Sequence, residues 1–146
     1  MLATEQGIDL LNSLLRGELA ATETYQQAIA KFDGTPHIGS LRRIHAEHRE
    51  AANTLRQHIH DVGGDPDQGS GAWGAWAKLV EGTAKIFGTT AALKALKEGE
   101  EQGISDYNDA LNEVGLPAEC KTLIRGQLLP QTRDHIETLD RLMAAP

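Results

Sequence analysis

The sequence predicts an all-α protein, a four-helix bundle with one long crossover between its second and third helices. Apolar residues recur with the 3.6-residue period of an α-helix, and no segment shows the sustained alternation that marks a strand. The 146 residues contain only 5 prolines, so long helices are not interrupted. Two short connections and one long one are typical of such a bundle. The length is normal for one domain, which we expect to span residues 1–146.

The first two expected helices end at residues that form turns. The first covers residues 4–31 and stops at the sequence DGTP, residues 33–36. The second covers residues 37–62 and ends at Gly63-Gly64, a pair that accepts left-handed backbone angles. These two helices therefore form a hairpin with a short connection.

The third and fourth expected helices form a second hairpin. The third starts at Thr89 or Thr90, either of which can serve as an N-cap, and continues to Val114. The sequence GLP follows as the turn, and the fourth helix covers residues 118–143. Pro130 lies inside it and removes a backbone donor, so we expect a bend or a bulge there.

The long crossover contains an amphipathic segment. A loop at residues 65–71 precedes the sequence AWGAWAKLVEGTAKIFG, whose aromatic and aliphatic residues fall on one face of an extra short helix. Burial of this face on the chain's own bundle is the first interpretation. The second is a homodimer interface through Trp73 and Trp76, because tryptophan is enriched at interface hot spots.

The charge balance limits the choice of partners. Asp and Glu number 21 against 14 Lys and Arg, a net charge of −7, and no basic cluster occurs, so neither nucleic acid nor a membrane surface is expected as a partner. Cys120 is the single cysteine and excludes an internal disulfide; we interpret it as structural. Neither a signal peptide nor a membrane span is recognisable, so we expect a cytoplasmic protein.

Each expected helix carries an ionisable residue in the middle of its apolar stripe. A lone buried carboxylate would cost several kcal/mol or become protonated, but acids and imidazoles that converge at one level can bind a divalent metal. The alternative is a metal-free arrangement in which each glutamate pairs with a histidine and fixes the helix register. The four residues are Glu18, His48, Glu100 and His135.

The two hairpins resemble one another in sequence. Glu18 and Tyr25 match Glu100 and Tyr107 at a constant separation of 82 positions, and His48 matches His135 at a separation of 87. A pseudo-twofold axis would therefore bring two related half-sites face to face. We expect the tyrosines in the core, where each hydroxyl needs a hydrogen-bond partner.

The sequence LLNSLLRGELAATETYQQA, residues 10–28, resembles the first helix of bacterioferritin and other ferritin-like proteins, with their N-x-x-L-x-x-E-L-x-A-x-x-x-Y pattern. The whole chain is similar to a bacterial family of ferritin-like four-helix bundles described as a domain of unknown function. That family has a GG-x-P loop before WG-x-WAK, here residues 63–66 and 73–78.

The resemblance implies a metal site with a reduced set of ligands. The ferritin-like di-iron site uses a glutamate on the first and third helices and Glu-x-x-His on the other two. The glutamate of both Glu-x-x-His motifs is absent, with His45 and Thr132 in its place, so ferroxidase activity is not favoured. A set rich in imidazole favours zinc, copper or a single iron over a carboxylate-bridged pair. The candidate metal ligands are Glu18, His45, His48, Glu100 and His135.

Two functions follow from the sequence. The first is a metal-binding bundle that holds Fe or Zn and handles iron with oxygen or peroxide. The second is a metal-free helical bundle with a role in stress or in protein interaction, with the aromatic segment as its interface.

Overall fold

The computed structural model describes residues 3–69 and 88–145, and these residues form helices and no strand. This confirms the predicted all-α bundle, and the helix ends lie within three residues of those expected. The short helix expected in the crossover, with Trp73 and Trp76, falls outside the described residues. The helices are α1 (Glu5–Lys31), α2 (Ile38–Asp61), α4 (Thr89–Leu111) and a fourth made of α5 (Ala118–Leu123), η2 (Ile124–Leu128) and α6 (Leu129–Ala144).

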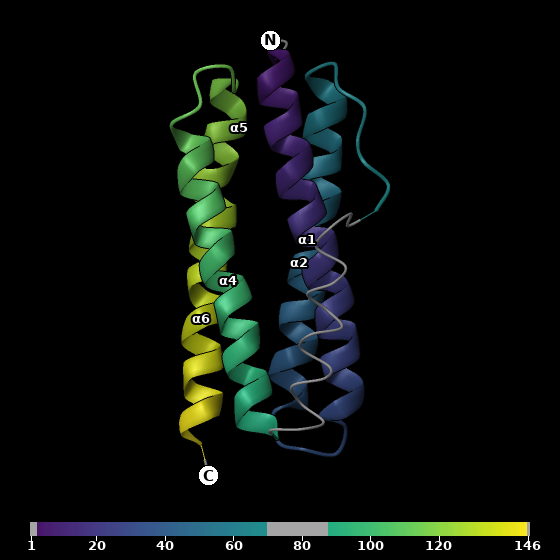
Figure 1. The fold of residues 1–146 in the computed structure, drawn as a ribbon, viewed down its shortest axis with the longest axis vertical. Helices are drawn as coiled ribbons and strands as arrows, with labels where there is room; N and C mark the ends of the chain where they lie inside the picture. Colours follow the sequence, from purple (N-terminus) through teal and green to yellow (C-terminus); the bar gives the residue numbers. More distant parts are fainter. Residues whose placement is uncertain (1–2, 70–87, 146) are drawn as a thin grey trace.

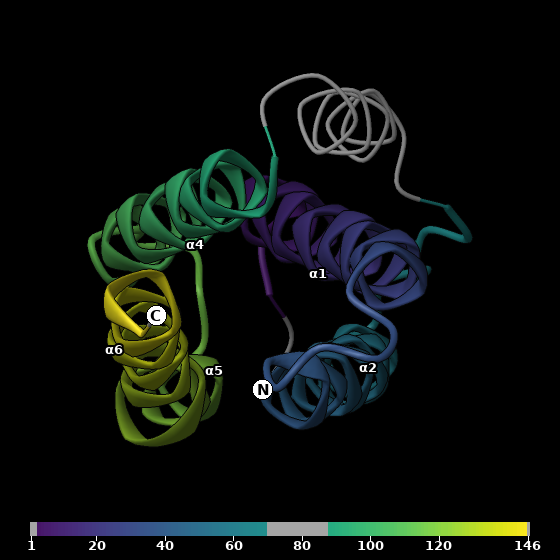
Figure 2. The same cartoon turned by 90° about the horizontal axis from the view of Figure 1, so that it is seen from below.

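The helices pair into two hairpins that lie side by side. α1 packs mainly on α2, and α4 packs mainly on α6, while α1 also contacts α4. All of them run along the long axis of the molecule in Figure 1. Seen from the end in Figure 2, they surround a common centre, with α1 and α4 adjacent on one side. The two similar halves of the sequence therefore correspond to the two hairpins.

The start of α1 is fixed against the turn between α4 and α5. The Thr4 side chain caps the helix by accepting a hydrogen bond from the Gly7 amide at 3.0 Å. The Thr4 amide also donates to the Gly115 carbonyl at 3.2 Å. A Cβ added to Gly115 would lie 2.0 Å from Thr4 Oγ1, so only glycine permits this close approach.

The end of α2 has the predicted left-handed glycine. Gly63 has a φ of 89°, which L side chains rarely adopt. The Gly64 amide then donates to the Ile59 carbonyl at 2.8 Å. This cap satisfies the last carbonyls of α2 and turns the chain back towards α1.

Pro130 produces the bulge that the sequence predicts. The residues before it, Ile124–Leu128, form a π-helical turn in which the Leu129 amide donates to Ile124, five positions back. A proline lacks the amide hydrogen and its ring clashes with the carbonyl four residues earlier, so the helix widens just ahead of it. The fourth helix continues beyond the bulge as α6.

A polar layer divides the hydrophobic core into two clusters. One cluster holds Leu11, Leu15, Leu55 and Ile124, and the other holds Phe32, Leu41, Leu93 and Leu139. Along every helix the ionisable residue of the central stripe separates the two clusters. The aliphatic side chains on both sides bury the layer along the bundle axis.

Within the described residues, no helix is long and apolar enough to cross a lipid bilayer. The single-domain organisation and the cytoplasmic localisation stay predictions.

Candidate metal centre

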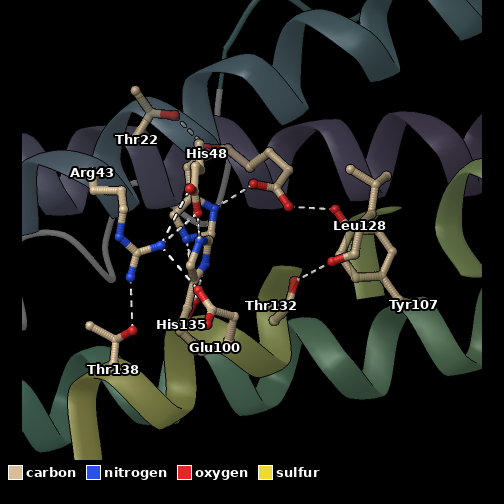
Figure 3. A network of polar contacts seen from close by, with 12 residues as sticks. Thr22, Arg43, His48, Glu100, Tyr107, Leu128, Thr132, His135 and Thr138 are labelled. Carbon is tan, nitrogen blue, oxygen red and sulfur yellow. Dashed lines mark hydrogen bonds and ion pairs between the residues drawn. The ribbon is translucent and has the colours of Figure 1, made fainter. Parts of the chain in front are cut away.

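The polar layer contains the four residues that the helical stripes predict. Each comes from a different helix, and Figure 3 shows His48, Glu100 and His135 converging between the helices. Their exposed fractions are 7% for Glu18, 5% for His48, 4% for Glu100 and 1% for His135. Ionisable groups buried this deeply need partners, and the layer supplies them.

His48 lies between two carboxylates from different hairpins. Its Nδ1 is 2.5 Å from Oε2 of Glu18 on α1, and its Nε2 contacts Oε1 of Glu100 on α4. Burial alone would lower the pKa of His48, but Glu100 and Glu18 raise it well above its ordinary value. In the metal-free protein, His48 is therefore an imidazolium that joins the two hairpins.

His135 continues the same chain of acids and imidazoles. Its Nδ1 lies 3.1 Å from Oε1 of Glu100, and its Nε2 lies 2.8 Å from Oε1 of Glu47 on α2. Burial by itself would raise the pKa of Glu100, but His48 and His135 lower it to about 2. Glu100 is thus a carboxylate that both imidazoles share.

Glu47 connects the buried layer to the surface. Its side chain is 30% exposed, and it also pairs with Arg43 one turn earlier on α2, at 3.2 Å. The guanidinium of Arg43 reaches Asp134 at 3.0 Å and donates to the Thr138 hydroxyl at 2.8 Å, both on α6. This surface group holds α2 against α6 beside the imidazole of His135.

The two tyrosines of the repeat differ in their partners. The Tyr107 hydroxyl donates to Oε1 of Glu18, as expected for a buried tyrosine beside a carboxylate. The hydroxyl of Tyr25 has no hydrogen-bond partner among the described residues, so the expectation is wrong for this residue. Its ring instead stacks on the His48 imidazole, with centroids 5.2 Å apart and planes at 26°.

Three residues of the layer can hold a metal ion together. His48, Glu100 and His135 each offer a ligand atom, and these atoms all lie within 4.8 Å of one another. Glu18 adjoins this group through His48. Two imidazoles and one carboxylate form a donor set that occurs at zinc sites and at mononuclear non-haem iron sites.

His45 is placed apart from this group. It is half-buried on α2, one turn before His48. Burial, Arg49 and His48 all lower its pKa, so it is held neutral. The ligand atoms that lie close together belong to His48, Glu100 and His135, and His45 is not part of this group.

Glu47 belongs to the polar layer although it is not among the candidate residues that the sequence predicts. It pairs with Arg43 on the same helix, but its contact with His135 was not expected. The one sequence signal for it is the internal repeat, because Glu47 and Asp134 are equivalent positions, 87 apart, next to the two buried histidines.

Cys120 is buried, and its thiol lies 3.8 Å from Nδ1 of His58. Burial, followed by the nearby Glu119, raises the pKa of the thiol, which keeps it protonated. This environment agrees with a structural role.

The fold and the polar layer define an all-α bundle with a buried histidine and glutamate cluster that can hold a metal ion. Residues 6–113, more than half of the chain, match the family described as a domain of unknown function, DUF2383. The chain therefore belongs to this family. No curated protein and no solved structure matches the chain.

Proposed function

We propose that this protein is a ferritin-like metal-binding protein that holds one divalent ion, Zn²⁺ or Fe²⁺, on the bundle axis. The observation that carries the proposal is the buried group of His48, Glu100 and His135. Its members come from α2, α4 and α6, so both hairpins contribute a ligand.

The charge of the layer supports a cation at this position. Glu18, Glu47 and Glu100 surround two histidines, so the carboxylates outnumber the imidazoles. The proton on His48 compensates part of this negative charge in the metal-free protein. A divalent ion would replace that proton and leave a neutral imidazole, which is the form that coordinates a metal.

The distances in the layer are close to those of a coordination sphere. Ligands that lie about 2.0–2.1 Å from a tetrahedral ion are roughly 3.3 Å apart. His135 Nδ1 and Glu100 Oε1 are separated by 3.1 Å, which is close to this value.

The ferritin-like relationship is supported by the placement of the ligands. Glutamates lie on α1 and α4, histidines on α2 and α6, and a tyrosine contacts the glutamate of α1. The glutamates of both Glu-x-x-His motifs are missing, so we propose a single ion rather than a bridged pair. With iron bound, the ion would supply an open position for dioxygen or peroxide, and the chain's own residues would set its charge and shield it from water.

Elemental analysis of protein purified without chelator tests the proposal. We expect about one Zn or Fe per chain, lost on treatment with EDTA, and a rise in melting temperature when either ion is returned. Glu100→Gln and His135→Gln should abolish stoichiometric binding, while His60→Gln, at an exposed position of the same protein, should not. Metal-free protein whose melting temperature is unchanged by Zn²⁺ and Fe²⁺ would refute the proposal.

The second candidate is a metal-free bundle with a role in stress or in protein interaction. The observation in its favour is that every ring nitrogen of His48 and His135 already has a carboxylate partner. Such a network fixes one register of the four helices without an ion. The same metal analysis separates the two candidates.

A further inference from the structure

We propose that the cavity between α1 and α4 is a binding site for a small uncharged molecule that accepts a hydrogen bond from the Tyr25 hydroxyl. The cavity borders the polar layer but does not depend on a bound ion. The proposal therefore stands or falls separately from the proposed metal site.

The walls of the cavity follow the internal repeat. Leu14, Gly17, Glu18 and Tyr25 on α1 are matched, 82 positions later, by Leu96, Gly99, Glu100 and Tyr107 on α4. Ala21 and Gly103 form a further matched pair of small residues. The repeated positions of the two hairpins therefore supply most of the cavity wall.

Glycines in the middle of both helices keep this cavity open. A glycine inside a helix is less favourable than alanine by about 0.5–1 kcal/mol, so it needs a reason. A Cβ added to Gly17 would meet no atom within 4 Å, and one added to Gly103 would only touch Thr132 Cγ2 at 3.6 Å. A side chain at either position would therefore not clash with the neighbouring helices. It would instead occupy the open space beside the polar layer, and glycine leaves that space free.

The size of the cavity limits the ligand. Its volume is about 60 Å³. A dry cavity of about 150 Å³ is known to accept benzene, and one water-sized group needs roughly 10–15 Å³ on the same measure. The cavity is therefore too small for an aromatic ring and accommodates roughly four to six water-sized groups.

Tyr25 supplies the polar group that would orient the ligand. It is 2% exposed, lines the cavity and has no hydrogen-bond partner among the described residues. Its counterpart Tyr107 donates to Glu18, but both oxygens of Glu100 already face the two histidines. A tyrosine hydroxyl is protonated at neutral pH, so Tyr25 can donate a hydrogen bond to the ligand. An unpaired buried hydroxyl is unfavourable, and a hydrogen bond to a ligand oxygen would remove that cost.

The charges around the cavity favour an uncharged ligand. Three carboxylates, those of Glu18, Glu100 and Asp106, line the cavity against the one charged imidazole of His48, so the lining carries a net negative charge and would repel an anion. An organic cation, unlike a coordinated metal ion, would find Glu18 and Glu100 already paired with His48, His135 and Tyr107. The aliphatic part of the lining, with Leu14 and Leu96, gives it no hydrogen bonds in exchange for its lost hydration. A neutral molecule of three to five non-hydrogen atoms with one acceptor oxygen satisfies both limits.

Acetone and acetate test this inference because they have the same size and shape and differ in charge. We expect metal-free protein to bind acetone with a millimolar dissociation constant, followed by amide and methyl NMR shifts centred on Leu14, Leu96 and Tyr25. Acetate should bind at least tenfold more weakly. Xenon should occupy the cavity in pressurised crystals, because its binding needs only apolar volume.

Two variants separate the role of the Tyr25 hydroxyl from that of the cavity volume. Tyr25→Phe should weaken acetone binding about three- to tenfold, the value of one hydrogen bond, and leave xenon binding unchanged. Gly17→Leu should abolish the binding of both probes, and the matched control Gly39→Leu, on α2 and outside the cavity lining, should leave both intact. Gly39 suits this purpose because a Cβ added there meets nothing within 4 Å.

Several results would overturn the inference. Wild-type protein that binds neither xenon nor acetone, or a crystal structure in which protein atoms fill the cavity, would exclude the site. Equal affinity for acetone and acetate would refute the preference for an uncharged molecule. Unchanged acetone affinity in Tyr25→Phe would refute the role of the hydroxyl. These measurements use wild-type or singly substituted chains without metal, so a failure of the metal proposal leaves them interpretable.

Discussion

Glu47 of α2 and His135 of α6 are 88 positions apart in the sequence, yet the Glu47 carboxylate lies 2.8 Å from Nε2 of the imidazole. The contact fixes the orientation of a histidine whose other nitrogen faces Glu100. A carboxylate on the second nitrogen of a metal-binding histidine sets its tautomer and raises its basicity.

Glu47→Gln should therefore weaken metal binding without abolishing it. We expect an affinity loss of about 10- to 100-fold, because the amide can still contact the ring but no longer carries the charge that supports it. Competition with a chromophoric chelator measures the change. Glu50→Gln, an exposed position on the same helix, should bind metal like the wild type; an equal loss in both variants would show that Glu47 has no special role.

His48→Ala should strongly destabilise the metal-free protein. The imidazolium lies between Glu18 and Glu100, and its removal leaves two buried carboxylates without their shared partner. We expect the free energy of unfolding to fall by about 3–5 kcal/mol. Urea denaturation followed by circular dichroism gives this value, with His60→Ala as the exposed control. A loss under 1 kcal/mol would mean that the layer relaxes or admits water.

The stability of the metal-free protein should pass through a maximum between the ordinary pKa values of Glu100 and His48. Glu100 titrates at about 2 in the folded chain against an ordinary 4.5, so stability should fall as the pH drops from 4.5 towards 2. The pKa of His48 is raised from 6.5, so its contribution is complete below 6.5 and decreases as the pH rises above that value. Urea unfolding across this range measures both slopes.

Two variants assign the pH dependence to these residues. His48→Gln should flatten the alkaline slope, whereas His60→Gln should retain it. A wild-type curve that stays level above pH 6.5 would contradict a charged His48 in the folded state.

Gly115→Ala should disturb the contact between the start of α1 and the turn that precedes α5. The added methyl would lie 2.0 Å from Thr4 Oγ1, so the helix cap or the turn must shift. We expect a destabilisation of about 1–3 kcal/mol, measured by urea denaturation. Gly39→Ala is the matched control: its Cβ has open space inside α2, and it should stabilise the protein by about 0.5–1 kcal/mol. If both variants changed the free energy of unfolding in the same direction, a clash with Thr4 could not be the cause of the effect at Gly115.

Much of the fold follows from periodicity in the sequence. The stripes that place Glu18, His48, Glu100 and His135 inward depend only on the 3.6-residue period, and the structure brings all four into one layer. A distortion of the helix at Pro130 was equally predictable, and of the bend or bulge expected there the structure shows the bulge.

The contacts between helices were less predictable, because they depend on helix rotation and on side-chain length. Glu47 lies next to His48 in the sequence and off the apolar stripe, but its long side chain reaches His135 across the gap between α2 and α6. His45 lies one turn from His48 and is half-buried, and the sequence alone does not decide whether such an edge position reaches the ligand group. The repeat also predicted equal partners for Tyr25 and Tyr107, but the two imidazoles already occupy the carboxylate nearest to Tyr25.

Equivalent residues of the two hairpins have different surroundings, and this affects how the sequence can evolve. If the bundle were a dimer of two identical hairpins, each substitution would appear in both copies at once. Here the equivalent positions sit in one polypeptide, so Glu18 can pair with a tyrosine while its twin Glu100 bridges two histidines. Joining the copies covalently lets each half specialise without altering the other.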